Sequence, residues 1–297
     1  MNIFDCCIFS DEKMLLNLRF NVLNKFVQKF IVVEANFTHS GHEKKFNFDI
    51  NDYPDFKDKI IYYRIENLPK NLHKISDNFD EESKSNLKIL NALILENFHR
   101  NYIYNALLKA KDEDLIIISD VDEIPNLENL STQHLKKDII IFKQLMCYYK
   151  FNLKHPTLEW FGSKATIKKK LKSPQWLRNI KNKIYPFWRI DTFFSNNKST
   201  SISIVENGGW HFTNIKEPKK IYQKFLTFLH HVDFEESGLL EKDIEHHVKN
   251  ETIPYNHNLD KSKKNWSENI RLEKLPDEEL PNYIQKNYKN YSQWIKY

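Results

Sequence analysis

Short apolar segments alternate with amphipathic segments through the first half of the chain. Spacings of three and four between apolar residues predict helices that start after Glu12 and span residues 86–109. Apolar runs typical of buried strands stand at residues 3–9, 30–33, 60–63, 115–118 and 139–142. This alternation predicts an α/β fold with a mostly parallel sheet flanked by helices. Ligands of such sheets bind beyond the carboxyl ends of the strands, so function is expected at residues 34–41 and 120–125.

The second half is patterned differently. We expect an irregular, aromatic-rich region over residues 143–210, with tryptophans that could stack on sugar faces. Residues 215–231 are expected to be helical, residues 233–279 to be loops, and residues 280–297 to form a docked terminal helix. The tryptophans that could stack on sugars are Trp160, Trp176, Trp188 and Trp210.

Composition excludes several classes of protein. An aromatic content of 14% excludes a mainly disordered chain, and only 5 glycines, with no glycine-rich phosphate motif, argue against dinucleotide enzymes and P-loop NTPases. Three cysteines without zinc spacing indicate a reducing compartment. We see no signal peptide and no apolar run long enough to span a membrane, so a cytoplasmic protein, with room for peripheral contact at the inner membrane face, is expected. The net charge of +5 fits a solvated lysine-rich surface, and nucleic acid is not an expected partner.

One acidic motif stands at the carboxyl end of a predicted strand. Asp120 and Asp122 follow the apolar run 115–118, and such a pair can hold a divalent cation that also binds phosphates. A D-x-D triplet alone is weak, since about one is expected by chance in a chain of this size. A second triplet at 112–114 precedes the strand and is interpreted as a polar turn. The alternative for Asp120 and Asp122 is an acidic turn or cap, and the motif alone does not choose.

Ordered sequence blocks extend this motif over most of the chain. The segment IIISDVDEIP resembles the metal-binding motif of glycosyltransferase family 17, and EKMLLNLRFN resembles its E-x-D-L-L-E-x-R-L-N helix, with Met14 and Asn17 in place of acids. Residues 4–6, 32–41 (VVEANFTHSG), 208–212 (GGWHF) and 281–295 resemble further blocks of the same family.

The resemblance implies a GT-A fold: one Rossmann-like domain over residues 1–297. Residues 1–142 would bind the nucleotide sugar, and residues 143–297 would supply the acceptor region and C-terminal helices. The implied activity is an inverting, metal-dependent hexosyltransferase, similar to β-1,4-N-acetylglucosaminyltransferases. It would use Mn²⁺ or Mg²⁺ and a UDP-sugar, UDP-GlcNAc by family, to form a β-linkage on a glycan or glycolipid acceptor.

The resemblance also suggests site residues. Asp120 and Asp122 would bind metal and diphosphate, with Asp122 the direct ligand. His211 would be a further metal ligand, or alternatively a histidine packed beside Trp210. Among donor-binding residues, Glu34 would accept from uracil N3–H or else be a polar strand end. The remaining donor-binding candidates are Asn36, Thr38, Arg100, Lys224 and His230, and the last three could instead lie on solvated or salt-bridged helix faces.

The general base is less defined. Glu123 and Glu159 are the catalytic candidates, and Asp191, Glu206 and Asp233 are further carboxylates in suitable regions. His230 matches a family histidine, but Val232 stands where an acid is expected. Two other functions stay open: a nucleotidyltransferase or phosphotransferase acting on sugars, and a non-catalytic carbohydrate- or nucleic-acid-binding module.

Overall fold

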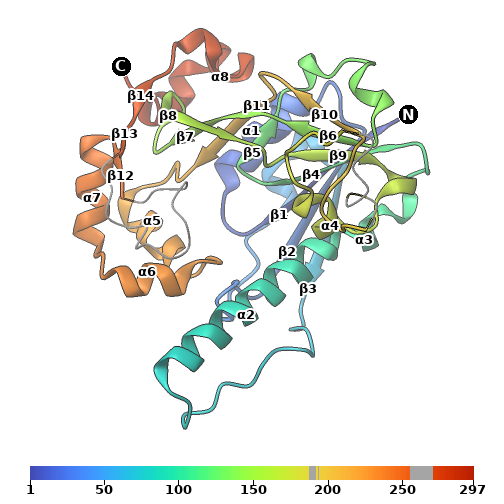
Figure 1. Ribbon diagram of the computed structural model, residues 1–297. Helices are drawn as coiled ribbons and strands as arrows, with labels where there is room; N and C mark the ends of the chain where they lie inside the picture. The colour runs from blue at the N-terminus through green and yellow to red at the C-terminus, as the bar shows by residue number, and fades with distance from the viewer. Residues whose placement is uncertain (187–191, 193, 255–269) are drawn as a thin grey trace.

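The computed structural model describes residues 1–186, 192, 194–254 and 270–297 (Figure 1). Within this part of the chain the largest sheet has seven strands, in the order β10-β6-β9-β4-β1-β2-β3. All neighbours pair in parallel except β9, which is antiparallel to both β4 and β6. The strands are β1 (Ile3–Phe9), β2 (Lys29–Ala35), β3 (Ile60–Ile65), β4 (Leu115–Asp120), β6 (Ile139–Phe142), β9 (Lys164–Ile167) and β10 (Ile202–Val205). The predicted α/β class with a mostly parallel sheet is confirmed.

Helices cover both faces of this sheet. Side chains alternate between the faces along each strand. Phe30 and Val32 of β2 pack into one core with α1 (Lys13–Leu23), whereas Ile31 and Val33 pack into another with α2 (Glu81–Asn101). The first core also takes in α8 (Asn282–Lys286), and the second takes in α3 (Ile103–Ala106) and α4 (Pro174–Asn179). The C-terminal segment is therefore docked, as predicted.

A second sheet has five strands among the described residues, in the order β14-β8-β7-β11-β5. They are β5 (Glu123–Pro125), β7 (Gln144–Tyr148), β8 (Leu153–Trp160), β11 (Gly209–Thr213) and β14 (Glu273–Lys274). The prediction of an irregular region over residues 143–210 is therefore wrong for β7, β8, β9 and β10 and for the start of β11. Leu153 and His155 of β8 are buried, but Thr157 and Glu159, which continue the same alternation, are exposed. The strand therefore shows no regular two-residue hydrophobic period in sequence.

The segment predicted as loops also contains helices. The structure has α6 (His231–Ser237) and α7 (Glu241–Asn250) there, followed by β12 (Thr252–Ile253) and β13 (Ile270–Arg271). In α7 only Ile244 is fully buried. The apolar face of this helix is narrow, so its mostly charged sequence shows no clear helical periodicity. The helix predicted over 215–231 is shorter, because Pro218 begins α5 (Pro218–Phe225) at its first turn.

Short 3₁₀ turns link these elements. They span Ile50–Asp52, Pro54–Phe56, Leu107–Lys109, Leu127–Asn129, His134–Lys136, Lys168–Lys170, Asp277–Glu279 and Tyr288–Trp294. The three cysteines are buried free thiols, in agreement with the absence of a disulfide framework. None of the described helices has the length and apolar character needed to cross a membrane.

Candidate active site

A cavity of about 740 Å³ lies at the carboxyl edge of the main sheet. Its floor comes from the residues at the ends of β1, β2 and β4, and its walls from the second sheet, the end of α2, and α5 with the turn that follows it. This is the edge where the sequence predicted function. The polar side chains that line it are Ser10, Asp11, Glu12, Thr38, His39, Lys44, Glu96, His99, Arg100, Asp120, Asp122, Trp160, Arg178, His211, Thr213, Asn214, Lys216, Lys220, Gln223, Lys224, Thr227, His230 and Asp233.

The two sheets bring His211 to the acidic motif. Strand β11 pairs antiparallel with β5, which places His211 opposite Glu123, and the Phe212 amide donates to the Asp122 carbonyl at 2.8 Å. This close pairing requires glycine at Gly209, where φ is +123° and a Cβ atom would lie 2.1 Å from the Ile124 carbonyl oxygen. The glycine of the GGWHF block therefore positions the histidine.

Asp122 is the acid at the centre of the cavity. Its Oδ1 lies 3.4 Å from His211 Nε2, and its Oδ2 lies 3.7 Å from Lys224 Nζ. Burial alone would raise the pKa of Asp122, but the neighbouring His211 and Lys224 outweigh burial and hold that pKa below its ordinary value. The ring of His211 lies against Trp160, with 4.7 Å between ring centroids. Asp122 is thus a carboxylate that stays ionised beside Lys224 and His211.

Asp120 has a different environment. Its Oδ1 accepts from Arg100 Nη2 at 2.9 Å, and its Oδ2 accepts from Arg178 Nη2 at 3.0 Å. Burial raises the pKa of Asp120, but Arg178 and Arg100 together lower it below the usual range. Each oxygen of Asp120 thus accepts from one guanidinium group, and the carboxylate anchors two arginines beside the cavity. The metal-binding role of Asp120 stays a prediction.

The remaining pair, Asp122 and His211, fits a shared cation. Two ligands about 2.1 Å from one ion and at right angles to each other lie roughly 3 Å apart, close to the 3.4 Å observed. No three carboxylate, imidazole or thiol groups converge on one point anywhere in the described ranges. A cation here would therefore need ligands from a diphosphate and water, which is the usual coordination of Mg²⁺ by protein and substrate.

Glu123 is a buried carboxylate that holds three residues of the cavity in position. Its carboxylate accepts from the Asp120 amide at 2.8 Å, Trp160 Nε1 at 2.6 Å and both terminal nitrogens of Arg178, at 2.7 and 2.9 Å. It is fully buried and does not line the cavity. Gly162 makes room for it, since a Cβ atom at that position would lie 1.9 Å from Glu123 Oε1. The geometry does not support the prediction that Glu123 is a catalytic base.

The second catalytic candidate, Glu159, is also outside the cavity. Its half-exposed side chain pairs with Lys143 at 2.9 Å, and Glu206 pairs with the same lysine at 3.0 Å. Strand β8 carries Glu159 to the outer surface because neighbouring side chains alternate in direction, and Trp160 is the one that faces the cavity.

The carboxylate of Glu34 is fully hydrogen-bonded to other groups of the protein. Its carboxylate accepts from Lys44 Nζ at 2.6 Å, the Asn47 amide at 2.8 Å, the Phe48 amide at 3.1 Å and the Tyr62 hydroxyl at 2.8 Å. It has no exposed surface and is not among the lining residues. The predicted contact with uracil is therefore not supported, because the segment after β2 folds back and takes every acceptor position of this carboxylate.

The other donor-binding candidates divide into two groups. Asn36 is turned away from the cavity and donates to the Glu66 carbonyl at 3.2 Å. The remaining four, Thr38, Arg100, Lys224 and His230, all line the cavity. Arg100 is also in the predicted salt bridge, with Glu96 as well as Asp120.

Several lining residues carry no pattern that the sequence could reveal. Arg178 reaches the site from α4, which lies outside every motif, and Lys216 pairs with Asp11 across 205 residues. Asp233, one of the carboxylates considered in the sequence analysis, lines the cavity and lies 3.3 Å from His230, one helical turn away. The GGWHF block and the match at His230 were the sequence features that pointed toward this part of the chain.

The tryptophans have separate environments. Trp160 lines the cavity, Trp210 is buried in the core beneath it, and Trp176 lines a different pocket. Trp188 and Asp191 lie outside the described residues.

The sequence model of glycosyltransferase family 17 matches residues 1–241, which include every residue of this cavity. The chain belongs to glycosyltransferase family 17. The predicted family is thereby confirmed, and with it the broader prediction of a glycosyltransferase. The fine details of donor, metal and linkage are not part of that match.

Comparison with other proteins adds a distant structural likeness. Similar solved structures include the galactosyltransferase LgtC in complex with donor and acceptor sugar analogues, at 13% identity and a TM-score of 0.29, and an active-site mutant of LgtC, at 14% and 0.26. Each match covers 60% of this family 17 chain, and 60% and 59% of the respective LgtC chains. No curated protein matches the sequence. A likeness at this level does not extend to substrate or mechanism.

Proposed function

We propose that this family 17 protein transfers a sugar, GlcNAc, from its UDP-sugar to a hydroxyl of a glycan or glycolipid, with inversion to a β-linkage. The observation that carries the proposal is the grouping of Asp122, His211 and Lys224 inside a cavity at the carboxyl edge of the main sheet. A nucleotide diphosphate is the ligand whose charge and size this grouping suits.

The lining supports an anionic donor. Lys216, Lys220 and Lys224 stand on or before one face of α5, and Arg100 and Arg178 face them from α2 and α4. Both arginines already pair with carboxylates, Arg100 with Asp120 and Glu96, and Arg178 with Asp120 and Glu123. Lys220 and Lys224 are therefore the cations that a diphosphate would meet. The diphosphate would lie between α5 and the end of β4.

Asp122 and His211 would hold Mn²⁺ or Mg²⁺, with His211 kept in orientation by Trp160. When bound, such an ion stabilises the negative charge that develops on a departing diphosphate. Asp122 contributes a carboxylate that is already ionised, and Lys224 adds a fixed positive charge beside it.

Asp233 is the best-placed general base among the described carboxylates of the cavity. Asp11 pairs with Lys216, Glu96 pairs with Arg100, and Glu12 accepts from the amides of Ser10 and Asp11. Asp233 has only the neighbouring imidazole of His230, and its side chain is 52% exposed. It can therefore accept a proton without losing an arginine, a lysine or a backbone amide.

The reaction then balances as a single displacement. The acceptor hydroxyl oxygen forms a bond to C1 of the sugar as the bond from C1 to the phosphate oxygen breaks. UDP leaves with the electron pair, and the hydroxyl proton passes to the carboxylate of Asp233. Attack opposite the leaving group inverts C1, and the protein contributes chiefly by holding the two substrates in line.

The test is release of UDP from a panel of UDP-sugars with Mn²⁺ or with EDTA. Wild type is compared with Asp122→Ala and with Asp112→Ala, which alters the exposed first residue of the D-x-D triplet before β4. We expect turnover of UDP-GlcNAc that is lost with EDTA and in Asp122→Ala but retained in Asp112→Ala. Release of pyrophosphate in place of UDP would establish a nucleotidyltransferase, and metal-independent turnover in Asp122→Ala would overturn the assignment of the site.

A further inference from the structure

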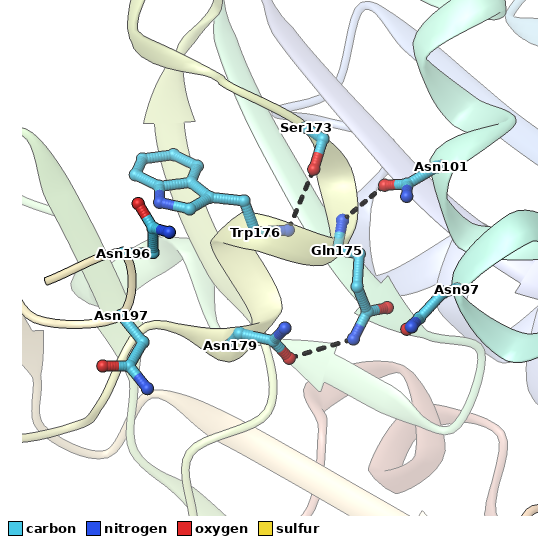
Figure 2. Close-up of a pocket in the computed structure, with 8 residues that line it drawn as sticks. All are labelled: Asn97, Asn101, Ser173, Gln175, Trp176, Asn179, Asn196 and Asn197. Carbon is cyan, nitrogen blue, oxygen red and sulfur yellow. Dashed lines mark hydrogen bonds between the residues drawn. The ribbon is translucent and has the colours of Figure 1, made fainter. Parts of the chain in front are cut away.

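A second pocket, of about 680 Å³, lies between the last turns of α2 and α4 (Figure 2). Its lining is almost entirely side-chain amides. The residues are Asn97, Asn101, Ser173, Gln175, Trp176, Asn179, Asn196 and Asn197. Among the described residues no charged side chain lines it, in contrast to the donor cavity.

Two helices present these amides in pairs. Asn97 and Asn101 are four residues apart on α2, and Gln175 and Asn179 are four residues apart on α4, so each pair shares a helix face. The two pairs are joined by a hydrogen bond in which the backbone N–H of Gln175 donates to Asn101 Oδ1 at 2.9 Å. Within the α4 pair, Gln175 Nε2 donates to Asn179 Oδ1 at 2.9 Å. The pocket is therefore held in shape by the protein's own hydrogen bonds.

Other donors and acceptors of these amides have no protein partner. Within the described part of the chain the side chains of Asn97 and Asn196 make no hydrogen bond, and the side-chain nitrogens of Asn101 and Asn179 donate to no protein atom, although their oxygens accept. Figure 2 shows Asn97 and Asn196 on opposite sides of the pocket, with Gln175 and Asn179 between them and the indole of Trp176 beside Asn196. Donors and acceptors thus surround the pocket next to a half-buried aromatic ring.

This chemistry suits a neutral sugar. A primary amide has donors and an acceptor, which matches hydroxyl groups that also donate and accept. The apolar C–H face of a sugar ring can pack on Trp176. Among the described residues that line the pocket none is charged, and the charge beside Trp176 is that of Lys172, whose Nζ lies 5.3 Å from the ring centroid. The lining therefore favours a neutral ligand over a nucleotide.

A chain of side-chain hydrogen bonds links the pocket to the donor cavity. Gln175 Oε1 accepts from Arg100 Nη1 at 2.5 Å, and Arg100 in turn holds Asp120 at 2.9 Å. Asn97 lines the pocket, and its neighbour Glu96 lines the cavity. We propose that this pocket binds a neutral sugar unit of the acceptor glycan, remote from the hydroxyl that reacts. The proposal rests on the proposed function for the identity of the glycan as acceptor.

The test measures saccharide binding separately from donor turnover. Calorimetric titrations use chitotetraose, mannotetraose and maltotetraose, with tetragalacturonate as the charged control. The variant Asn97→Ala/Asn196→Ala removes two amides that hold nothing in the protein, and Asn105→Ala, an exposed asparagine of α3 outside the pocket, is the matched control. We expect one neutral tetrasaccharide to bind, with affinity lowered about tenfold in the double variant and unchanged in the control.

Three outcomes would overturn the proposal: unchanged affinity in the double variant, tighter binding of tetragalacturonate than of the neutral sugars, or no binding of any neutral tetrasaccharide up to about 10 mM. UDP release without acceptor is measured on the same samples. The double variant should keep that activity, so loss of saccharide binding is separable from failure of the donor site. Absence of UDP release in wild type would count against the proposed function and leave the saccharide result independent.

Discussion

The guanidinium of Arg19 makes two hydrogen bonds to the carboxylate of Asp5, at 2.7 and 2.5 Å, with both side chains excluded from solvent. Arg19 also donates to the carbonyl oxygens of Asp120, at 3.2 Å, and Glu123, at 2.5 Å. One buried ion pair therefore ties β1 and α1 to the backbone turn that presents Asp122. Its two residues belong to family blocks with no apparent catalytic chemistry, and their function is to position the acidic motif.

Replacing one member of this pair should be costly. Arg19→Leu leaves the Asp5 carboxylate buried without a partner, and we expect the free energy of unfolding to fall by about 3–5 kcal/mol. Urea unfolding measures the loss. The double variant Asp5→Leu/Arg19→Leu removes both charges and should recover much of that stability, while UDP release stays low because the turn at residues 120–123 has lost its support. A loss below about 1 kcal/mol in Arg19→Leu would contradict this account.

The sequence could predict the parts of the fold that depend on short-range pattern. Strand β1 has the predicted bounds, and β4 extends the predicted run only to Asp120, because buried parallel strands read as uninterrupted apolar residues. Strand β8 and helix α7 were missed, since each buries only part of its length and carries polar residues elsewhere. Period-based prediction has little signal in such segments.

The sequence predicted the site residues that lie within recognisable motifs, but not the contacts between distant segments. The structure places Asp122 and His211 together, as the acidic motif and the GGWHF block implied. The role of Asp120 depends on Arg178, 58 residues away on a helix without a motif, and no local pattern contains that pairing. Sequence position made Glu34 a candidate for donor binding and Glu123 a candidate for catalysis, because both are acids next to strands, but only the fold shows that their oxygens already accept hydrogen bonds.

Buried His99 should make the protein sensitive to acid. Its Nε2 lies 3.0 Å from the Val33 carbonyl, and burial, with His39 nearby, lowers the pKa of His99 to about 3. In the unfolded chain the pKa returns to roughly 6.5, so the unfolded state binds the extra proton between pH 6.5 and 3. Stability that is complete above pH 6.5 is therefore lost as the pH falls through this window.

The variant His99→Gln keeps a donor for the Val33 carbonyl but cannot titrate. Urea unfolding from pH 7 to pH 4 should show a shallower decline than wild type, by up to about 1.4 kcal/mol per pH unit. Parallel curves for the two proteins would mean that His99 is not kept neutral by its surroundings.

Asp233→Asn should remove the proposed base without disturbing the donor site. We expect the rate constant for transfer to an acceptor to fall by about 100-fold or more, with UDP affinity unchanged. Glu236→Gln alters an exposed carboxylate on the same helix outside the cavity and is the matched control. Equal rates for Asp233→Asn and Glu236→Gln would exclude Asp233 as the base.

Lys224→Gln should weaken binding of the UDP diphosphate and leave the proposed metal ligands in place. Lys224 Nζ lies 3.7 Å from Asp122 Oδ2, and its side chain is 23% exposed, so it can reach a phosphate in the cavity. Losing one charge-assisted contact at a partly solvated site predicts about tenfold weaker UDP binding by calorimetry at low salt, with a smaller difference at high salt. Lys219→Gln changes an exposed lysine of α5 outside the cavity, and this variant should bind UDP as wild type does.

Because Asp122 and His211 are untouched, turnover by Lys224→Gln should still require Mn²⁺ or Mg²⁺, whereas Asp122→Ala loses turnover altogether. Wild-type UDP affinity in Lys224→Gln at low salt would place the diphosphate elsewhere in the cavity.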